Sequence, residues 1–227
     1  MKYLKDGWLI LLLAIVFGSG LAYINAALND QINANKKNET YNQLPALLLG
    51  AQAVDTSKTV VEGINVTAKD SAGKVVAKYR VWEQSVKGAK GIYTVYVCYK
   101  EKESKPCGFV VKSKGNGFAD TIEALIGVNA RVEKITGIYV LDQKETPGLG
   151  DKITSDWKNQ YQGKAADGNL KVGKKLNEEQ KKTQIDAISG ATISSDSLTK
   201  IVNSAINTLK TDLTAGKIGP GADKEAK

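Results

Sequence analysis

The sequence predicts an α+β protein, in which a twisted, mostly antiparallel sheet with a few packed helices follows one N-terminal transmembrane helix. Three observations lead to this class: an uncharged apolar run near the start, a central region of β-branched runs separated by turn residues, and a helix-periodic segment near the end. With 227 residues, 42% of them hydrophobic, the chain can bury the core of one globular domain beside this helix. The predicted parts are a cytoplasmic N-terminus (1–6), a transmembrane anchor (7–28), a connector (29–58), an extracytoplasmic domain (59–212) and a flexible tail (213–227).

The predicted anchor, Gly7–Leu28, contains no charged residue. As a helix it would be about 33 Å long, which is enough to cross the hydrocarbon core of a bilayer. Trp8 and Tyr23 lie near its ends, where amphipathic rings prefer the membrane interface. Because Lys2 and Lys5 precede the run, the positive-inside rule keeps the N-terminus cytoplasmic and places the domain outside.

A signal peptide cleaved before Ala27 is the alternative interpretation of this run. We favour the uncleaved anchor, because the apolar stretch exceeds the roughly 7–15 residues of a signal-peptide core. The connector that follows is polar at first and then apolar at Leu44–Leu49. We expect the apolar face of this second part to point to the bilayer.

The composition narrows the possible functions. The formal charge of +8 is compatible with nucleic-acid binding, but the lysines are scattered among acids, with no basic run interleaved with aromatics, so we predict a solvated basic surface and no nucleic acid. The chain has no His and only two Cys, too few for the four ligands of an ordinary iron–sulfur cluster. If this protein carries electrons, the carrier should be organic.

The central region contains runs typical of strands. They cover Val60–Thr67, Lys74–Val81, Ile92–Tyr99, Phe109–Lys112, Thr121–Val128 and Val132–Leu141, with a hairpin turn at Asp70–Gly73. Cys98 and Cys107 flank the charged loop between the third and fourth of these runs. In an oxidising compartment they could form a disulfide, and two unpaired thiols are the alternative.

The region after the predicted sheet begins with a turn and a short helix. Pro147-Gly148 predicts a type II turn, in which the glycine supplies the positive φ. Ile153, Trp157 and Tyr161 recur every four residues, which predicts a short amphipathic helix capped by Thr154 or Ser155. A further strand is expected within Asn169–Gly173.

The stretch Asp186–Thr192 leads into the last predicted helix, whose apolar face is formed by Leu198, Ile201, Val202, Ala205, Ile206 and Leu209. Ser194 or Ser195 is the expected N-cap. Ser189-Gly190-Ala191 forms a turn with little side chain, so a ligand can approach its backbone closely. A phosphate on the Thr192 hydroxyl would lie in the favourable field of the helix N-terminus.

Two motifs resemble signatures of the FMN-binding domain family. Asp186-x-x-Ser189-Gly190-Ala191-Thr192 is similar to its flavinylation motif, in which FMN is joined through its phosphate to the last threonine by a separate flavin transferase. Glu145-Thr146-Pro147-Gly148-Leu149-Gly150 is similar to its second signature. Gly117-Phe118-Ala119-Asp120 departs from the family by having Asp120 where a glycine is common. The resemblance covers about Thr59–Leu209.

The resemblance implies roles for these residues. Thr192 would carry covalent FMN, while Ser189, Gly190 and Ala191 would shape the phosphate turn. Asp186 would serve recognition by the transferase. Further residues are candidates for the pocket around the flavin ring or ribityl chain: Glu145, Thr146, Gly148 and Leu149.

The family includes the G subunit of the Rnf ion-pumping ferredoxin:NAD complex and the C subunit of the sodium-pumping NADH:quinone reductase. The resemblance therefore implies an electron-carrying flavoprotein subunit of a membrane complex, rather than a catalyst that acts alone. We prefer the G subunit of the Rnf complex, because the C subunit of the quinone reductase tends to be longer than this chain. The alternatives are a C-type quinone reductase subunit, a cofactor-free scaffolding domain and, last, a separate outer-surface reductase.

Overall fold

The computed structural model describes residues 2–49, 60–62, 65–69, 75–88 and 91–219, and for 2–6, 49, 60–62, 65–69 and 75–77 it describes only the backbone. The elements are α1 (Lys2–Leu49), β1 (Val60–Glu62), β2 (Asn65–Lys69), β3 (Val75–Gly88), β4 (Gly91–Lys100), β5 (Pro106–Asn116), β6 (Thr121–Asn129), β7 (Ile135–Asp142), η2 (Gly150–Thr154), η3 (Asp156–Tyr161), β8 (Lys171–Gly173), α2 (Glu178–Lys181), β9 (Gln184–Asp186) and α3 (Thr192–Thr214). Residues 1–39 and 40–227 form two compact units, and each is described by itself.

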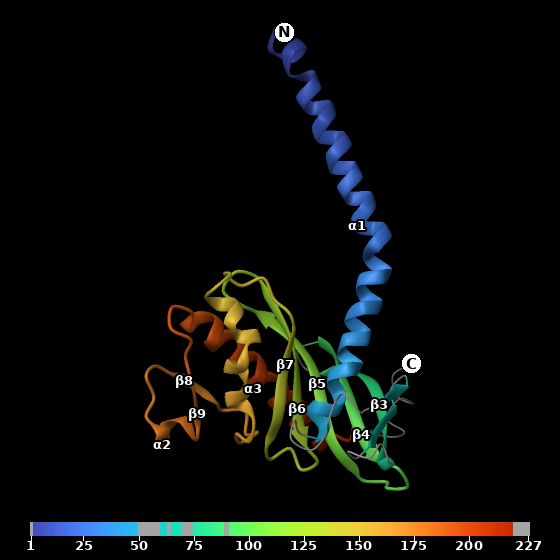
Figure 1. Cartoon of the computed structure of the whole chain (residues 1–227), viewed down its shortest axis with the longest axis vertical. Coiled ribbons are helices and arrows are strands. Elements are labelled where there is room, and N and C mark those ends of the chain that lie inside the picture. The colour runs from blue at the N-terminus through green and yellow to red at the C-terminus, as the bar shows by residue number, and fades with distance from the viewer. Residues whose placement is uncertain (1, 50–59, 63–64, 70–74, 89–90, 220–227) are drawn as a thin grey trace. The chain divides into compact units, whose positions relative to one another are not determined.

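The second unit is built on a seven-stranded sheet, β1 to β7, in which each strand pairs antiparallel with the next one along the chain (Figure 1). A separate pair, β8 and β9, is parallel. Together with the packed helices, this sheet confirms the predicted α+β class. Side chains alternate between the two faces of the sheet, as expected for strands, and both faces of the central strands are buried.

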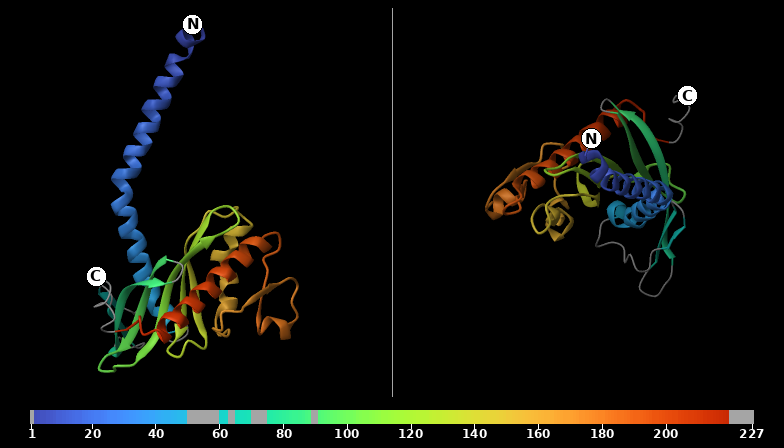
Figure 2. Two further views of the ribbon diagram at one scale, coloured as in Figure 1. Left: turned by 180° about the vertical axis from the view of Figure 1, so that it is seen from behind. Right: turned by 90° about the horizontal axis from the view of Figure 1, so that it is seen from above.

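The last helix, α3, covers one face of the sheet (Figure 2). Its predicted apolar positions, Leu198 to Leu209, are all buried, and they pack against residues such as Val95, Val97 and Val111. Gly115 makes close contact possible, because a Cβ there would lie 2.7 Å from the Ile201 side chain. The helix periodicity in the sequence therefore predicted the packing face correctly.

The C-terminal part of α1 covers the opposite face. Leu44, Leu47 and Leu48 are buried in a cluster with sheet residues that include Tyr96 and Leu125. The expectation that the apolar face of Leu44–Leu49 points to the bilayer is therefore wrong. These leucines have an alternative apolar partner, the outer face of the sheet, and they form part of the domain core.

Small residues let α1 approach the strands closely. The Thr136 hydroxyl donates a hydrogen bond to the Leu47 carbonyl. A Cβ at Gly127 would lie 2.5 Å from that same carbonyl oxygen, and one at Gly137 would lie 3.3 Å from the Leu47 side chain. Gly127 and Gly137 are opposite each other on β6 and β7. This glycine pair provides the space in which the end of α1 lies.

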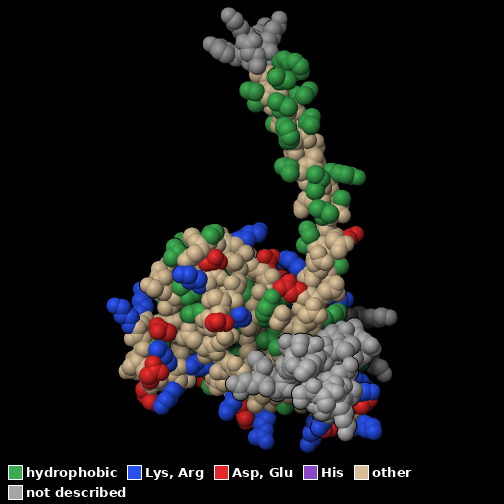
Figure 3. All heavy atoms as spheres, in the orientation of Figure 1, with side chains coloured by type: hydrophobic (Ala, Val, Ile, Leu, Met, Phe, Trp, Pro, Cys, Tyr) green, Lys and Arg blue, Asp and Glu red, His purple; other side chains and the backbone are tan. Residues whose placement is uncertain are grey.

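The first unit is the rest of α1. Among the described residues, one stretch, Gly7–Leu48 in α1, is long and apolar enough to cross a membrane, by length and composition alone. Its apolar side chains, from Trp8 to Leu28, are exposed (Figure 3). On the domain, Figure 3 shows cations and anions interspersed, as expected for a solvated basic surface.

Several boundaries differ from the predictions. Val60–Thr67 is not one strand, because β1 and β2 pair with each other at Val60↔Thr67. The predicted turn at 70–73 lies outside the described residues. β7 begins at Ile135, because Val132 has a left-handed φ of 54° in the preceding turn.

The helix predicted around Ile153, Trp157 and Tyr161 is two consecutive 3₁₀ helices, η2 and η3. Ser155 caps the second one and accepts a hydrogen bond from the Trp157 backbone N–H at 3.3 Å. The predicted cap is thus correct at Ser155. Ile153 and Tyr161 are both fully buried, so these two predicted apolar positions do face the core.

Cys98 and Cys107 form a disulfide, with Cα atoms 5.3 Å apart, across the loop between β4 and β5.

The residues that follow α3 contact β3. The side-chain amide of Gln84 donates to the Lys217 carbonyl at 2.9 Å and accepts from the Gly219 N–H at 3.1 Å. These hydrogen bonds hold the first part of the predicted tail against β3.

Candidate functional site

A pocket of about 540 Å³ lies at the N-terminus of α3, where four separate segments of the chain meet. The residues that line it are Phe118, Thr146, Leu149, Gly150, Lys174, Gly190, Ala191, Thr192, Ile193 and Ser194. Five of these are predicted site residues: Thr146 and Leu149 from one motif, and Gly190, Ala191 and Thr192 from the other. The fold thus brings together two motifs about 40 residues apart in the sequence.

Thr192 is the first residue of α3 and is half-buried at the pocket. Ala191 is the N-cap, and its side chain cannot accept a hydrogen bond from the helix amides. The first backbone N–H groups of a helix have no intrahelical acceptor. The start of α3 therefore presents donors, and the positive end of the helix dipole, at the Thr192 hydroxyl.

The two serines predicted to cap this helix have other roles. Ser195 Oγ accepts from the Ile188 N–H at 3.0 Å and donates to the Ala191 carbonyl at 3.0 Å, so it fixes the turn that precedes the helix. Ser194 Oγ donates to Glu145. The cap prediction is wrong because both hydroxyls have tertiary or turn partners and the N-cap position falls earlier, at Ala191.

The turn before Thr192 depends on Gly190. This residue has a φ of +81°, which is strained for any residue with a side chain, and a Cβ there would lie 3.1 Å from the Leu149 side chain. The Ala191 N–H donates to the Ile188 carbonyl at 3.0 Å and closes the turn. Ser189 is exposed and does not line the pocket.

The residues Gly190 to Ser194 form one wall of the pocket, and the motif Glu145–Gly150 forms the opposite wall. The Leu149 N–H donates to the Thr146 carbonyl at 3.2 Å, and Gly148 has a φ of +75°, as predicted for a Pro-Gly turn. Gly148 shapes this turn but does not line the pocket. Glu145 does not line it either, since its carboxylate is buried behind the wall at 4% exposure.

Sequence reasoning did not place Phe118, Ile193 and Lys174 in the site. Phe118 and Ile193 are 61% and 58% exposed, and with Leu149, at 42%, they form an apolar rim around the pocket. Large exposed apolar side chains at a pocket mouth are typical of ligand sites. The aromatic in the Gly117–Asp120 loop was the available signal, whereas nothing in the sequence pointed to Lys174.

Asp186 lies outside this pocket. Its backbone N–H donates to Gln160 Oε1 at 2.9 Å, and its carbonyl accepts from Trp157 Nε1 at 2.7 Å. Asp186 lines a separate depression of about 260 Å³ that also includes Lys181. The motif therefore extends over two surfaces: Thr192 lies at the pocket and Asp186 lies at the other depression.

Asp120, which replaces the common glycine, forms an ion pair with Lys144 at 3.1 Å. The Thr121 N–H and the Lys144 ammonium both lower the pKa of its carboxyl below the ordinary value. The Asp120 carbonyl accepts from the Gly117 N–H at 2.7 Å, which closes the 117–120 loop. Asp120 thus shapes this loop without lining the pocket.

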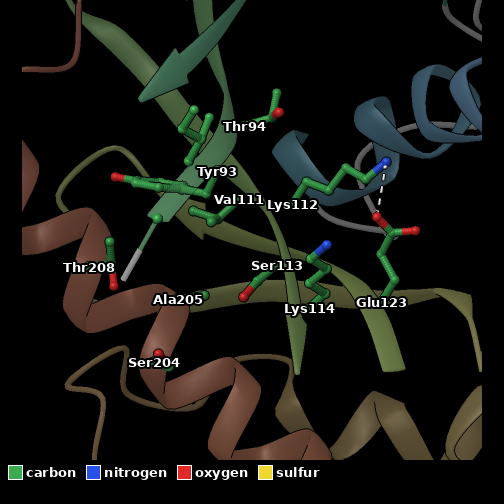
Figure 4. Close-up of a pocket in the computed structure, with 12 residues that line it drawn as sticks. Tyr93, Thr94, Val111, Lys112, Ser113, Lys114, Glu123, Ser204, Ala205 and Thr208 are labelled. Atoms are coloured by element: carbon green, nitrogen blue, oxygen red, sulfur yellow. Dashed lines mark ion pairs between the residues drawn. The ribbon is translucent and has the colours of Figure 1, made fainter. Parts of the chain in front are cut away.

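Another depression, of about 350 Å³, lies where the β3–β4 and β5–β6 hairpins diverge beside α3 (Figure 4). Glu123 pairs with Lys112 there at 3.2 Å, and the Tyr93 hydroxyl donates to Asp212 at 2.8 Å. Burial and this hydrogen bond raise the pKa of Tyr93. None of the predicted site residues lines this depression, so it is not the candidate site.

The candidate pocket combines two kinds of surface. Helix amides and Lys174 favour an anion near Thr192, and the rim of Phe118, Leu149 and Ile193 favours a flat apolar group. A ligand with a phosphate and an aromatic ring system, such as FMN, has both features, so the residues present fit it.

Comparison with known proteins agrees with this geometry. Residues 117–207, which include the Phe118 loop, both walls and most of α3, match the model of the FMN-binding domain family. Among solved structures, the C subunit of the Na⁺-translocating NADH-quinone reductase of Parabacteroides distasonis has a similar fold. Its TM-score is 0.52 at 20% identity, over 82% of this chain and 95% of that one.

Two relatives are G subunits. The G subunit of the Na⁺-translocating ferredoxin:NAD⁺ oxidoreductase complex of Acetobacterium woodii is 39% identical over 100 residues, which are 44% of this chain and 47% of that protein. The G subunit of the proton-translocating complex of Clostridium ljungdahlii is 33% identical over 118 residues, 52% of this chain and 60% of that one. The chain thus spans about half the length of the relatives it matches. Over its segment 117–207 the chain is similar to the FMN-binding domain family.

Proposed function

We propose that this chain is the flavoprotein subunit of an Rnf-type ion-translocating ferredoxin:NAD⁺ oxidoreductase complex. In this proposal it carries FMN through a phosphoester to the Thr192 hydroxyl and relays electrons within the membrane assembly. The observation that carries the proposal is the position of Thr192, the first residue of α3, in a pocket walled by the second family motif. The G-subunit relatives support the choice of complex.

Thr192 supports covalent attachment on chemical grounds. Thr192 is the first residue of α3, where the backbone N–H groups lack intrahelical acceptors, and Lys174 lines the same pocket. These groups would stabilise the charge of a phosphodiester there. A covalent bond also prevents loss of the cofactor from a site that is open to solvent.

When bound, FMN supplies the capacity to accept and donate electrons. The chain's own residues hold and orient it. The Gly190 turn lets the backbone approach the phosphate, and the apolar rim is placed to cover part of the ring and exclude water from it. Among the described residues, the pocket contains no carboxylate or imidazole that could act as a general acid or base, as suits a relay that needs position rather than proton transfer.

Partners follow from the same proposal. A separate flavin transferase would attach FMN, and the half-buried Asp186, at its own surface depression, would take part in recognition by that enzyme. The apolar stretch of α1 would anchor the domain beside the other membrane proteins of the complex. With the N-terminus in the cytoplasm, the domain lies outside, so its electron donor and acceptor are membrane proteins rather than soluble nicotinamide.

The flavin can be tested directly. The full chain, produced together with a flavin transferase, should keep a flavin absorbance spectrum after denaturation and gain the mass of FMN minus water. A colourless protein of unmodified mass, made beside a positive control for the transferase, would instead favour a cofactor-free scaffolding domain.

Topology needs a separate test. In intact cells stripped of their wall, added protease should reach the loop between Cys98 and Cys107 while a cytoplasmic marker stays protected. Sequencing of the mature N-terminus should show that the apolar run Gly7–Leu28 is retained. A first residue of Ala27 would show that the apolar run is a cleaved signal peptide.

A further inference from the structure

Glu145 is a buried carboxylate that faces donors from both sides of the pocket. Its Oε1 accepts from the backbone N–H groups of Phe118, at 2.9 Å, and Ala119, at 3.1 Å. Its Oε2 accepts from Ser194 Oγ. Because Ser194 lies in the first turn of α3, this one side chain ties the 117–120 loop to the helix that begins with Thr192.

The neighbouring glycines show that the carboxylate is tightly packed as well as hydrogen-bonded. A Cβ at Gly117 would overlap Glu145 Oε1. A Cβ at Gly150 would lie 2.9 Å from Glu145 Cβ and 2.7 Å from Ser194 Oγ. The position of Glu145 therefore requires glycine at 117, in the loop that carries Phe118, and at 150, in the wall formed by the 145–150 motif.

The energetics favour this arrangement in the absence of any ligand. A buried carboxylate is costly unless donors satisfy it, and here two amides and a hydroxyl do so. The N-terminal turn of α3 adds a favourable field for a negative charge. All three donors belong to the protein itself.

We propose that Glu145 is a positioning residue, which assembles the walls of the flavin pocket before any flavin is present. This inference rests on the proposed function for the identity of the ligand, but not for the contacts themselves. Glu145 fixes the backbone of Phe118, which lies at the rim, and holds the first turn of α3 against it. If instead the flavin orders this loop, the loop amides should be unprotected in the flavin-free protein.

Amide hydrogen exchange on the flavin-free full chain, made without the transferase, separates the two cases. The amides of Phe118 and Ala119 should be protected. Glu145→Ala should reduce their protection about 10- to 100-fold, as expected when a hydrogen bond to a charged acceptor is lost. The amide of Ile206, deep in α3, serves as the internal reference and should not change.

Two further variants distinguish the loss of these hydrogen bonds from a general loss of folding. Ser194→Ala removes one donor but leaves both bonds to Oε1, so Phe118 should stay largely protected. Glu145→Gln keeps an acceptor oxygen without the charge, so it should fold, lose less protection than the alanine variant, and alter the visible circular dichroism of attached flavin. Unprotected Phe118 in the flavin-free wild type, or unchanged protection in both Glu145 variants, would overturn the proposal.

Flavin attachment to the wild-type chain is scored in parallel. Its absence would count against the proposed function, while the exchange result would still decide whether Glu145 assembles these walls.

Discussion

Replacing Thr192 with valine is expected to give a folded protein that carries no flavin after denaturation. Valine has nearly the shape of threonine and lacks only the oxygen that would form the phosphoester. Thr192 is half-buried at the first position of α3, where its hydroxyl caps no helix amide, so little stability should be lost. In-gel flavin fluorescence and intact mass measure the result.

The matched control is Ser189→Ala. Ser189 lies three residues before Thr192 in the same motif and also carries a hydroxyl, but it is exposed and outside the pocket. This variant should keep its flavin. Flavin on the denatured Thr192→Val protein, or its loss only in Ser189→Ala, would assign the attachment elsewhere.

The same valine variant tests the relay. In the assembled membrane complex it should leave the set of assembled proteins unchanged and abolish electron flow from the cytoplasmic donor to the final acceptor. Undiminished turnover in a correctly assembled complex would place this flavin off the main path of electrons.

The second large effect concerns the end of α1. A chain that begins at residue 30 should fold and accept flavin, whereas a chain that begins at residue 50 should aggregate or unfold. The shorter chain loses Leu44, Leu47 and Leu48, which cover one face of the sheet. Full burial of a leucine contributes about 1.5–3 kcal/mol, so three approach the roughly 5–15 kcal/mol stability of a whole domain.

A point substitution in the full domain makes the comparison quantitative. Leu44 is fully buried, so Leu44→Ala should lower the free energy of unfolding by about 2–5 kcal/mol. Asn42→Ala, at an exposed position two residues away, should change it by less than about 0.5 kcal/mol. Denaturant unfolding of the chain from residue 30 measures both. Equal stability of the two variants would mean that this helix end is not part of the core.

The sequence alone determined the features that depend on local pattern. Alternating β-branched residues predicted the central strands, and the spacing of Leu198, Ile201 and Leu209 predicted the buried face of α3, because a strand or helix imposes its own period on the residues it buries. The uncharged run from Gly7 to Leu28 indicated an apolar helix, since it is long enough to span a bilayer without a charge. The turn residues Gly148 and Gly190 predicted the backbone shape of the two motifs, whereas the assignment of these motifs to one site came from their resemblance to the FMN-binding domain family.

Some side chains could pack against or hydrogen-bond to more than one partner, and only the tertiary structure shows which partner each one contacts. Lipid and the apolar face of a sheet would both remove the side chains of Leu44, Leu47 and Leu48 from water. Only the fold shows that the sheet covers them. The hydroxyls of Ser194 and Ser195 suit a helix cap, but Glu145 and the Ile188 amide bind them instead. Phe118 lies at the pocket because the carboxylate of Glu145, 27 residues away, binds the backbone of its loop. A contact between residues so far apart produces no periodic pattern in the sequence, so the sequence could not predict it.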